Sequence, residues 1–281
     1  MSIWVIIILG LVQGASEFLP ISSSGHLVLF YKIFKVEDNT ILLSVILHVA
    51  TLLAVLVCYR KQIFELIKHP FCETNKKLIV ATIPTVIIVL ILKNLVEKTF
   101  SGDFIIVGFI ITAIVLLISQ MMDNKSNKQQ NNNFVADSNM FLTEPYNITN
   151  LNVSYKQALL IGTAQGIAIF PGISRSGSTI ATSLIAGVKK RVAADFSFLL
   201  SIPIIIGGLL FEVLEVCMGN AELNINFLSL GVGFLFSFLS GLLCINLMLK
   251  FVKKQKLTWF SFYLVLLSLF LVLNKFVFHL F

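Results

Sequence analysis

Charged residues are scarce in this sequence. They make up 12% of its 281 residues, whereas a soluble domain carries about 25%. Hydrophobic residues account for 57% of the chain, and the mean hydropathy is +0.93. This composition excludes an ordinary soluble enzyme. It predicts a polytopic α-helical membrane protein, because a membrane-spanning helix needs about 20 mostly apolar residues.

Three further absences narrow the class of protein. No Lys or Arg precedes Lys32, so the basic start of a secretory signal peptide is missing. The four cysteines form no C-x-x-C pair, which argues against zinc and redox sites and leaves them as apolar packing residues. Basic residues lie in short loops between apolar runs, so the net charge of +7 indicates orientation in a membrane and no nucleic-acid partner.

Long apolar runs predict six membrane-spanning helices, at residues 41–59, 78–96, 104–122, 196–217, 227–249 and 257–281. Two further apolar regions, 3–30 and 158–188, are interrupted near their middle by Pro, Gly and Ser, and we expect each to be a broken helix. Between the two halves, residues 123–157 are polar and include N-K-Q-Q-N-N-N, which predicts a flexible linker.

The two broken regions resemble each other. When the first is shifted by 152 positions, eight of the sixteen residues from 10 to 25 are identical to their counterparts without a gap. Most of these identities are Gly, Gln or Ser, whereas chance similarity between apolar segments usually matches Leu and Ile. The pattern indicates an internal duplication, with one membrane repeat in residues 1–122, a linker in 123–157 and a second repeat in 158–281.

The distribution of Lys and Arg relates the two repeats to each other. Fifteen of these residues lie in loops 60–77, 123–157, 189–191 and 250–256, which we expect to be cytoplasmic. The second broken region then has both flanks on the cytoplasmic side and is re-entrant, and by symmetry the first is re-entrant from the outside. The predicted fold is all-α, with two inverted-topology repeats, each a re-entrant broken helix plus three transmembrane helices. Such repeats place polar residues near mid-membrane, where the halves meet.

The first broken region contains Q-G-A-S-E-F-L-P-I-S-S-S-G-H at residues 13–26. Gln13 and Glu17 are four residues apart and share one helix face, and Ser23 and His26 follow the break. A carboxylate inside a membrane costs several kcal/mol unless it is paired, which makes Glu17 a candidate functional residue. The alternative is a buried ion pair that only joins two helices.

The second broken region contains F-P-G-I-S-R-S-G-S-T at residues 170–179. Amides at a helix start, a forked guanidinium and several hydroxyls together form a cradle for an anion such as phosphate. The alternative is a polar helix cap whose arginine extends to the membrane surface. The candidate binding residues are Gly172, Ser174, Arg175, Ser176, Gly177 and Thr179.

Together the two motifs suit phosphoryl transfer, in which positioning and charge neutralisation do most of the catalysis. Glu17, with Gln13, could hold a divalent cation against phosphate oxygens. His26 or Ser23 could be the nucleophile with the other assisting, and the sequence does not rank them. His48 lies in a predicted span and either lines the same cavity or packs between helices.

Both motifs resemble the two signature regions of the undecaprenyl-diphosphate phosphatase family, bacterial membrane enzymes also named for bacitracin resistance. The first signature is Glu or Gln, three residues, then Glu, matched by Gln13 and Glu17. The second is P-G-x-S-R-S-x-x-T, matched by residues 171–179. The similarity covers nearly the whole chain except the Asn-rich linker.

This resemblance implies a multi-pass enzyme of the bacterial cytoplasmic (inner) membrane whose active site opens to the outer face. Its substrate would be the polyprenyl lipid undecaprenyl diphosphate, hydrolysed to inorganic phosphate and the monophosphate carrier used for peptidoglycan and other cell-wall glycans, and the activity would confer bacitracin resistance. A divalent cation, Mg²⁺ or Ca²⁺, would bind Glu17 and Gln13. Arg175 and the cradle hydroxyls would hold the diphosphate, with His26 and Ser23 as nucleophile candidates. The oligomeric state stays open, with a homodimer as one option.

Two other classes of protein share parts of this pattern. Type-2 phosphatidic acid phosphatases also carry S-G-H and S-R elements, but their essential His and Asp would fall on Ala181 and Ile185 here. A transporter or lipid flippase could have the same inverted repeats. Transport alone would need only the binding half of the polar set, so the combination of His, Glu, Ser and Arg favours hydrolysis.

Overall fold

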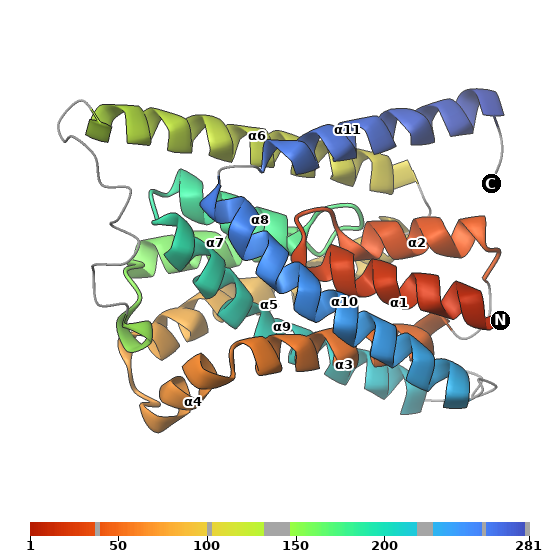
Figure 1. Cartoon of the computed structure of the whole chain (residues 1–281), viewed down its shortest axis with the longest axis horizontal. Coiled ribbons are helices and arrows are strands. Elements are labelled where there is room, and N and C mark those ends of the chain that lie inside the picture. The colour runs from red at the N-terminus through yellow and green to blue at the C-terminus, as the bar shows by residue number, and fades with distance from the viewer. Residues whose placement is uncertain (37–39, 100–102, 132–146, 218–226, 255–256, 279–281) are drawn as a thin grey trace.

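The computed structural model describes residues 1–36, 40–99, 103–131, 147–217, 227–254 and 257–278. Every regular element in these ranges is a helix, which confirms the predicted all-α class (Figure 1). In chain order, the elements are α1 (Ile3–Phe18), α2 (Ser23–Ile33), α3 (Thr40–Cys58), α4 (Arg60–Lys68), α5 (Glu73–Thr99), α6 (Asp103–Asn131), η1 (Ile148–Asn150), α7 (Tyr155–Ile167), α8 (Arg175–Ile185), α9 (Lys190–Cys217), α10 (Phe227–Lys253), α11 (Thr258–Leu273) and η2 (Asn274–Phe278).

The long helices have the length and surface of membrane spans. Within the described residues, five helices are long and apolar enough to cross a membrane, and a sixth crossing results if the bent pair α3–α4 is one span. Their outer faces expose large apolar side chains, such as Ile91 at 73% and Leu210 at 61%. Such exposure along whole helices suits a lipid environment, in which apolar side chains need no burial in protein. This agrees with the six predicted runs.

Both predicted broken helices are present. α1 is followed by a break that contains Pro20, and α2 begins at Ser23. α7 is followed by a break that contains Pro171 and Gly172, and Gly172 has a φ of +86°, a conformation that a side chain would strain. In Figure 1, α1 and α2 lie toward the end of the molecule that carries both termini, whereas α7 and α8 lie toward the opposite end.

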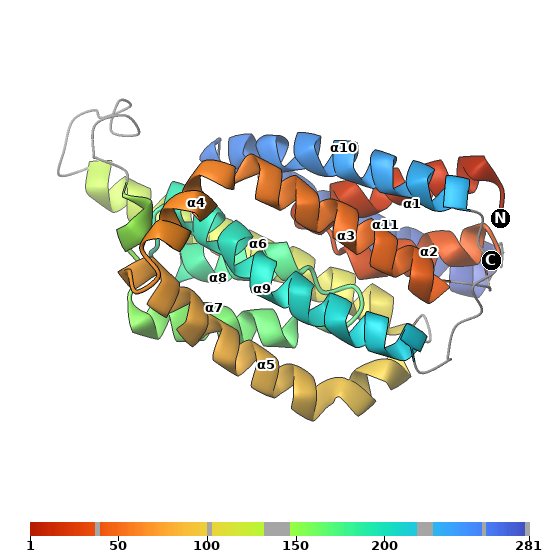
Figure 2. The ribbon, with the colours of Figure 1, turned by 90° about the horizontal axis from the view of Figure 1, so that it is seen from below.

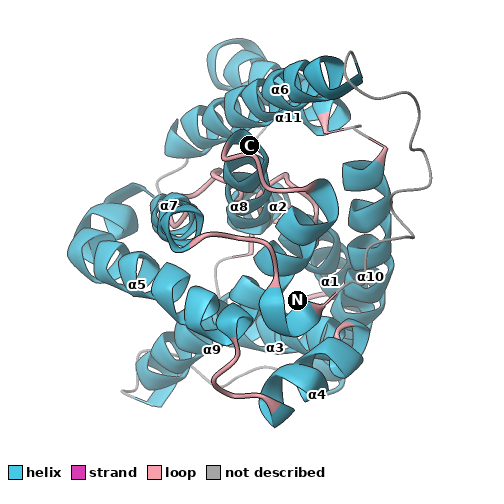
Figure 3. Cartoon of the chain, turned by 90° about the vertical axis from the view of Figure 1, so that its left-hand side faces the viewer, coloured by secondary structure: helices cyan, strands magenta, loops and turns pink. Residues whose placement is uncertain are grey.

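Helices of one half of the chain pack against helices of the other half. α1 packs along α10, α7 along α5 and α6 along α11, and α3 contacts α9 (Figure 2). α8 contacts both α6 and α9 and lies between them (Figure 3). The breaks are therefore enclosed by protein, which is the condition for non-helical backbone at membrane depth.

Glycines bring two of these helix pairs into close contact. A side-chain carbon at Gly14 of α1 would lie 2.2 Å from the carbonyl oxygen of Ser237 in α10. One at Gly162 of α7 would lie 1.9 Å from the carbonyl oxygen of Ala81 in α5. Both positions are among the glycines that the two broken regions share, so this part of the sequence similarity reflects helix packing.

The segment predicted as a flexible linker, 123–157, is regular at both ends. Helix α6 continues to Asn131, and residues 147–157 form η1 and the start of α7. The prediction of a flexible linker is wrong for these two stretches. It relied on polar composition, which does not show where a helix ends once it extends beyond its apolar span. Residues 132–146 lie outside the described residues.

The segment before α7 is docked against α5. The Leu151 N–H donates to Thr74 Oγ1 at 2.9 Å, and Lys77 Nζ donates to the Leu151 carbonyl oxygen at 3.0 Å. Leu151 and Val153 are both buried. Two apolar residues in a polar stretch have no periodicity, so their burial could not be predicted from the sequence.

Replacing Gly162 by Ala is expected to destabilise the protein, because the added carbon would overlap the backbone of α5. Overpacking of this kind costs about 1–3 kcal/mol. Gly207→Ala in α9 is the matched control, since nothing lies within 4 Å of its added carbon and Ala favours a helix. Thermal unfolding in detergent should show a lower midpoint for Gly162→Ala only. Equal midpoints for wild type and Gly162→Ala would contradict this packing.

Candidate active site

The break after α1 and the start of α8 touch each other. The Ser176 hydroxyl of α8 donates to the Leu19 carbonyl oxygen at 3.1 Å. A side-chain carbon at Gly177 would lie 3.1 Å from Pro20 Cβ. The two motifs, which are far apart in the sequence, therefore belong to a single site.

Glu17 is the centre of this site. Its Oε2 accepts hydrogen bonds from the Ser23 hydroxyl at 2.6 Å and from Gln13 Nε2 at 3.2 Å. Its Oε1 pairs with the guanidinium of Arg175, and His48 Nε2 lies 4.0 Å from Oε2. Only 7% of Glu17 is exposed, so these partners make the hydrogen bonds that water would otherwise make to a carboxylate.

Arg175 is the first residue of α8 and points into the protein. Its side chain is 16% exposed and reaches Glu17, which excludes an arginine that extends to the membrane surface. The ion pair between Glu17 and Arg175 does join α1 to α8, as expected if Glu17 only joins two helices. It also lies against Gln13, Ser23 and His48, which a simple helix joint would not need.

The hydroxyls of the second motif hold its loop together. Ser174 Oγ accepts from the Gly177 N–H at 3.1 Å, and the Ser174 N–H donates to Thr112 Oγ1 at 3.0 Å. Thr179 Oγ1 donates to the Arg175 carbonyl oxygen at 3.0 Å. The Ser174 and Thr179 side chains are both buried. Of the predicted phosphate-binding side chains, Arg175 is the one that reaches the carboxylate cluster.

His26 is held apart from the carboxylate. Its Nδ1 lies 2.8 Å from the Ser22 carbonyl oxygen, and its Nε2 lies 2.7 Å from Tyr263 Oη, with the two rings stacked at 15°. A carbonyl oxygen only accepts, so Nδ1 carries the proton and Nε2 accepts from the Tyr263 hydroxyl. Within the described residues, no hydrogen bond or ion pair joins His26 to Glu17 or Ser23. The structure therefore brings Ser23, and not His26, to the carboxylate.

Sequence reasoning missed three residues that support the site. Thr112 Oγ1 donates to the Gly172 carbonyl oxygen at 3.1 Å, Ser197 contacts the Thr179 hydroxyl, and Tyr263 binds His26. Each is a polar residue in an apolar span. The sequence therefore indicates that each makes a buried hydrogen bond, but it does not indicate with which residue. For His48, where two roles were left open, the structure favours the site.

The oxygen atoms around Glu17 suit a hard divalent cation. Gln13 Oε1 is buried and has no hydrogen-bond partner, and the Ser23 hydroxyl lies beside the carboxylate. Carboxylate, amide and hydroxyl oxygens are the ligands that Mg²⁺ and Ca²⁺ prefer, and Mg²⁺ is usually shared between one or two carboxylates and a phosphate. Among the described residues, no group of three or more His, Cys, Asp or Glu could hold a metal. The residues present therefore fit a cation shared with a phosphate ligand.

Replacing Tyr263 by Phe should expose the lone pair of His26 Nε2, because the hydroxyl that covers it is removed. We expect diethyl pyrocarbonate to modify His26 several-fold faster in this variant, measured by mass spectrometry of the peptide. Tyr155→Phe is the control, since Tyr155 bonds to Glu73 far from the site. An unchanged rate for Tyr263→Phe would mean that the hydroxyl does not cover Nε2.

The chain matches one protein family and several known proteins over most of its length. The family described as Bacitracin resistance protein BacA matches residues 6–270. An undecaprenyl-diphosphatase of Carboxydothermus hydrogenoformans is 39% identical over 264 residues, with 93% of each chain covered. An undecaprenyl-diphosphatase of Treponema denticola is 40% identical over 283 residues, with 96% of each chain covered. An undecaprenyl-diphosphatase 3 of Bacillus cereus is 37% identical, also with 96% of each chain covered.

These matches extend over almost the whole chain, far beyond the two motifs from which the resemblance was recognised. They confirm the family that those motifs indicated. The chain therefore belongs to the bacitracin resistance protein BacA family.

Proposed function

We propose that this chain is an integral membrane phosphatase that hydrolyses undecaprenyl diphosphate to undecaprenyl phosphate and inorganic phosphate. One observation carries the proposal: the Ser23 hydroxyl lies 2.6 Å from one oxygen of Glu17, while Arg175 pairs with the other. A hydroxyl that donates to a carboxylate base, with a guanidinium on the other oxygen of that carboxylate, is an arrangement for nucleophilic attack on a phosphate. The names of the relatives support the same substrate.

Ser23 is the nucleophile in this proposal. Its Oγ attacks the terminal phosphorus, its proton passes to Glu17, and the bond between that phosphorus and the bridging oxygen breaks, which releases undecaprenyl phosphate. Glu17 then gives this proton to the leaving undecaprenyl phosphate and is a carboxylate again. Water attacks the phosphoserine and passes a proton to Glu17, the bond between the phosphorus and Ser23 Oγ breaks, and Oγ takes that proton back from Glu17 as inorganic phosphate leaves. His26 fits this role less well, because both of its ring nitrogens are in hydrogen bonds.

Arg175 holds the charge of the phosphate. Its guanidinium has five N–H donors in a fixed fork, so it can keep its contact with Glu17 and still donate to phosphate oxygens. Glu17 and Gln13 would hold a Mg²⁺ or Ca²⁺ ion, which when bound would neutralise negative charge on the diphosphate. Gln13 keeps its side chain in place by donating to Glu17.

We further infer the arrangement of the chain in the membrane. Two inverted repeats, residues 1–122 and 158–281, are supported by the opposite placement of α1–α2 and α7–α8 in Figure 1 and by the glycines they share. The basic loops would face the cytoplasm of a bacterial inner membrane, with the site open to the outer face. Recycling of the lipid carrier for cell-wall synthesis and resistance to bacitracin would follow from the activity, and a homodimer remains compatible with it.

Ser23→Ala should abolish phosphate release from undecaprenyl diphosphate, with a loss of about 10²–10⁴-fold or more in kcat. Ser24→Ala is the matched control, because the Ser24 hydroxyl contacts Ser22 and not the carboxylate. Release would be measured from purified protein in detergent with Mg²⁺, after checking that all variants unfold at similar temperatures. Full activity of Ser23→Ala would remove Ser23 as the nucleophile. No release by folded wild type in several detergents and lipids would overturn the proposed activity.

Gln13→Glu should make the stability of the protein depend more strongly on Mg²⁺. Two carboxylates four residues apart repel each other without a cation and share one when it is present. Mg²⁺ should therefore raise the unfolding temperature of Gln13→Glu more than that of wild type, and a chelator should lower it more.

Gln165→Glu is the control, because Gln165 occupies the corresponding position in the second motif and bonds to Thr85, with no carboxylate partner. Equal Mg²⁺ shifts for Gln13→Glu and Gln165→Glu would argue against a cation at Gln13.

A further inference from the structure

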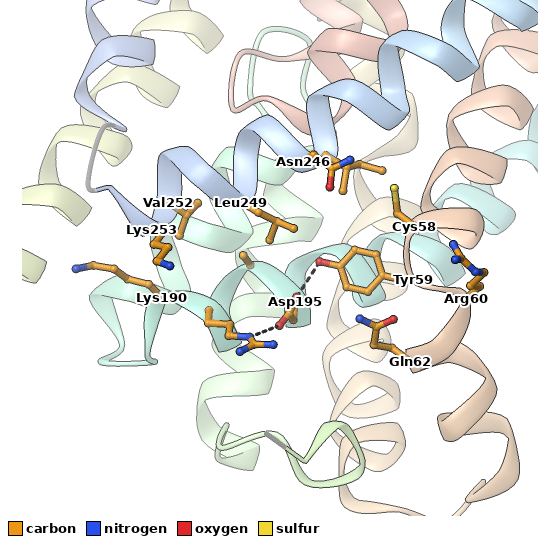
Figure 4. Close-up of a pocket in the computed structure, with 13 residues that line it drawn as sticks. Cys58, Tyr59, Arg60, Gln62, Lys190, Asp195, Asn246, Leu249, Val252 and Lys253 are labelled. Atoms are coloured by element: carbon orange, nitrogen blue, oxygen red, sulfur yellow. Dashed lines mark hydrogen bonds and ion pairs between the residues drawn. The ribbon is translucent and has the colours of Figure 1, made fainter. Parts of the chain in front are cut away.

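A second polar cavity lies away from the carboxylate site, where the carboxyl ends of α3 and α10 meet the start of α9 (Figure 4). Its volume is about 480 Å³. Four cationic side chains line it, from Arg60, Lys190, Arg191 and Lys253, against one carboxylate, from Asp195. The formal charge of the lining is therefore +4 − 1 = +3, which selects for an anion.

The single carboxylate of the cavity is held by protein groups. The Tyr59 hydroxyl donates to Asp195 Oδ1 at 2.8 Å, and Arg191 Nε lies 3.9 Å from Oδ2 (Figure 4). Asp195 is only 7% exposed. The Tyr59 bond joins the second turn of α9 to the residue that follows α3, so this part of the cavity wall is held by a contact between two helices.

The cavity lies where two candidate membrane spans end. Lys190 begins one candidate span and Lys253 ends another, and Arg60 begins α4 at the bend of the α3–α4 pair. There the chain bends by 75° into α4, whose Phe64 and Ile67 are 59% and 69% exposed. A short helix with basic and exposed apolar residues beside a span is typical of the membrane interface.

The walls of the cavity match an amphiphile and not a bare ion. Ile245, Leu249 and Val252 of α10 add apolar side chains to a lining that also carries the four cations. Its volume lies in the range of about 300–1,000 Å³ that small-molecule sites occupy. A lipid headgroup with its glycerol would contact both kinds of wall, whereas inorganic phosphate would use the charged one alone.

This cavity is separate from the carboxylate site. His48, which contacts Glu17, lies ten residues before Cys58, a lining residue, on the same helix. Ten helical residues span about 15 Å. None of the residues of the carboxylate site lines the cavity.

We propose that this cavity binds the phosphate headgroup of an anionic phospholipid from the leaflet at the basic end of the protein. Arg60 and Arg191 can each offer a fork of donors to phosphate oxygens, and Lys190 and Lys253 add positive charge. Basic pockets between spanning helices are known as sites for such headgroups. The proposal does not depend on the phosphatase activity, since it concerns different residues.

The test compares lipid retention by the full-length protein in nanodiscs of phosphatidylcholine with and without phosphatidylglycerol. Native mass spectrometry counts retained lipids, and thermal unfolding measures the protection that they give. Wild type should retain phosphatidylglycerol in preference to phosphatidylcholine. The double variant Lys190→Gln/Lys253→Gln should lose that preference about tenfold or more, which corresponds to about 1.4 kcal/mol. Lys61→Gln/Lys68→Gln is the matched control, because it removes the same charge from α4 outside the cavity.

The outcomes distinguish a lipid phosphate from free inorganic phosphate as the ligand of the cavity. Equal retention by the two double variants, or no preference for phosphatidylglycerol in wild type, would overturn the proposal. Protection by inorganic phosphate that matches protection by phosphatidylglycerol would assign the cavity to a free anion and also overturn it. If the cavity double variant unfolds, Arg60→Gln replaces it, with Lys61→Gln as its neighbour control.

Discussion

A carboxylate and a guanidinium remain charged inside a membrane only when each neutralises the other, and Glu17 and Arg175 meet this condition across the two halves of the chain. Because Glu17 is in the last turn of α1 and Arg175 is the first residue of α8, the end of one helix and the start of the other must lie at the same depth. The break after α7 places Arg175 at the start of α8, and Glu17 lies in the last turn of α1 just before the other break, so both charges are next to a helix end. The ion pair thus sets where the polar part of the protein lies.

Ending helices at this depth leaves backbone groups that the helix itself cannot satisfy. The serines at corresponding positions of the two motifs solve the problem in the same way: Ser22 Oγ accepts from the Gly25 N–H at 3.3 Å, and Ser174 Oγ accepts from the Gly177 N–H at 3.1 Å. Much of the hydroxyl content of both motifs therefore serves the backbone. Ser23 is the exception, because its hydroxyl is directed to a carboxylate.

The sequence was informative where a charged or helix-breaking residue lies within an apolar run. Glu17 and Arg175 are charges in apolar runs, and proline and glycine interrupt those runs, so the breaks and the two charged site residues could be predicted. Their pairing with each other was not predicted, because no pattern in the sequence links the two positions. Contacts between distant spans could not be predicted either, because a single polar residue such as Tyr263 on an apolar helix points to no particular partner. The same limit explains the docked segment around Leu151, whose burial depends on α5 and not on any local pattern.

The partner of Glu17 lies 158 residues further along the chain. At about 5–20 residues per second, α8 is synthesised roughly 8–30 s after α1. Among the described residues, the partners of Glu17 that are synthesised in that interval or before it are Gln13, Ser23 and His48. The groups that surround the carboxylate in the finished protein are thus also the ones that can shelter it during membrane insertion, before its counter-ion exists. The ion pair can therefore form only after the start of α8, in the second half of the chain, has been synthesised.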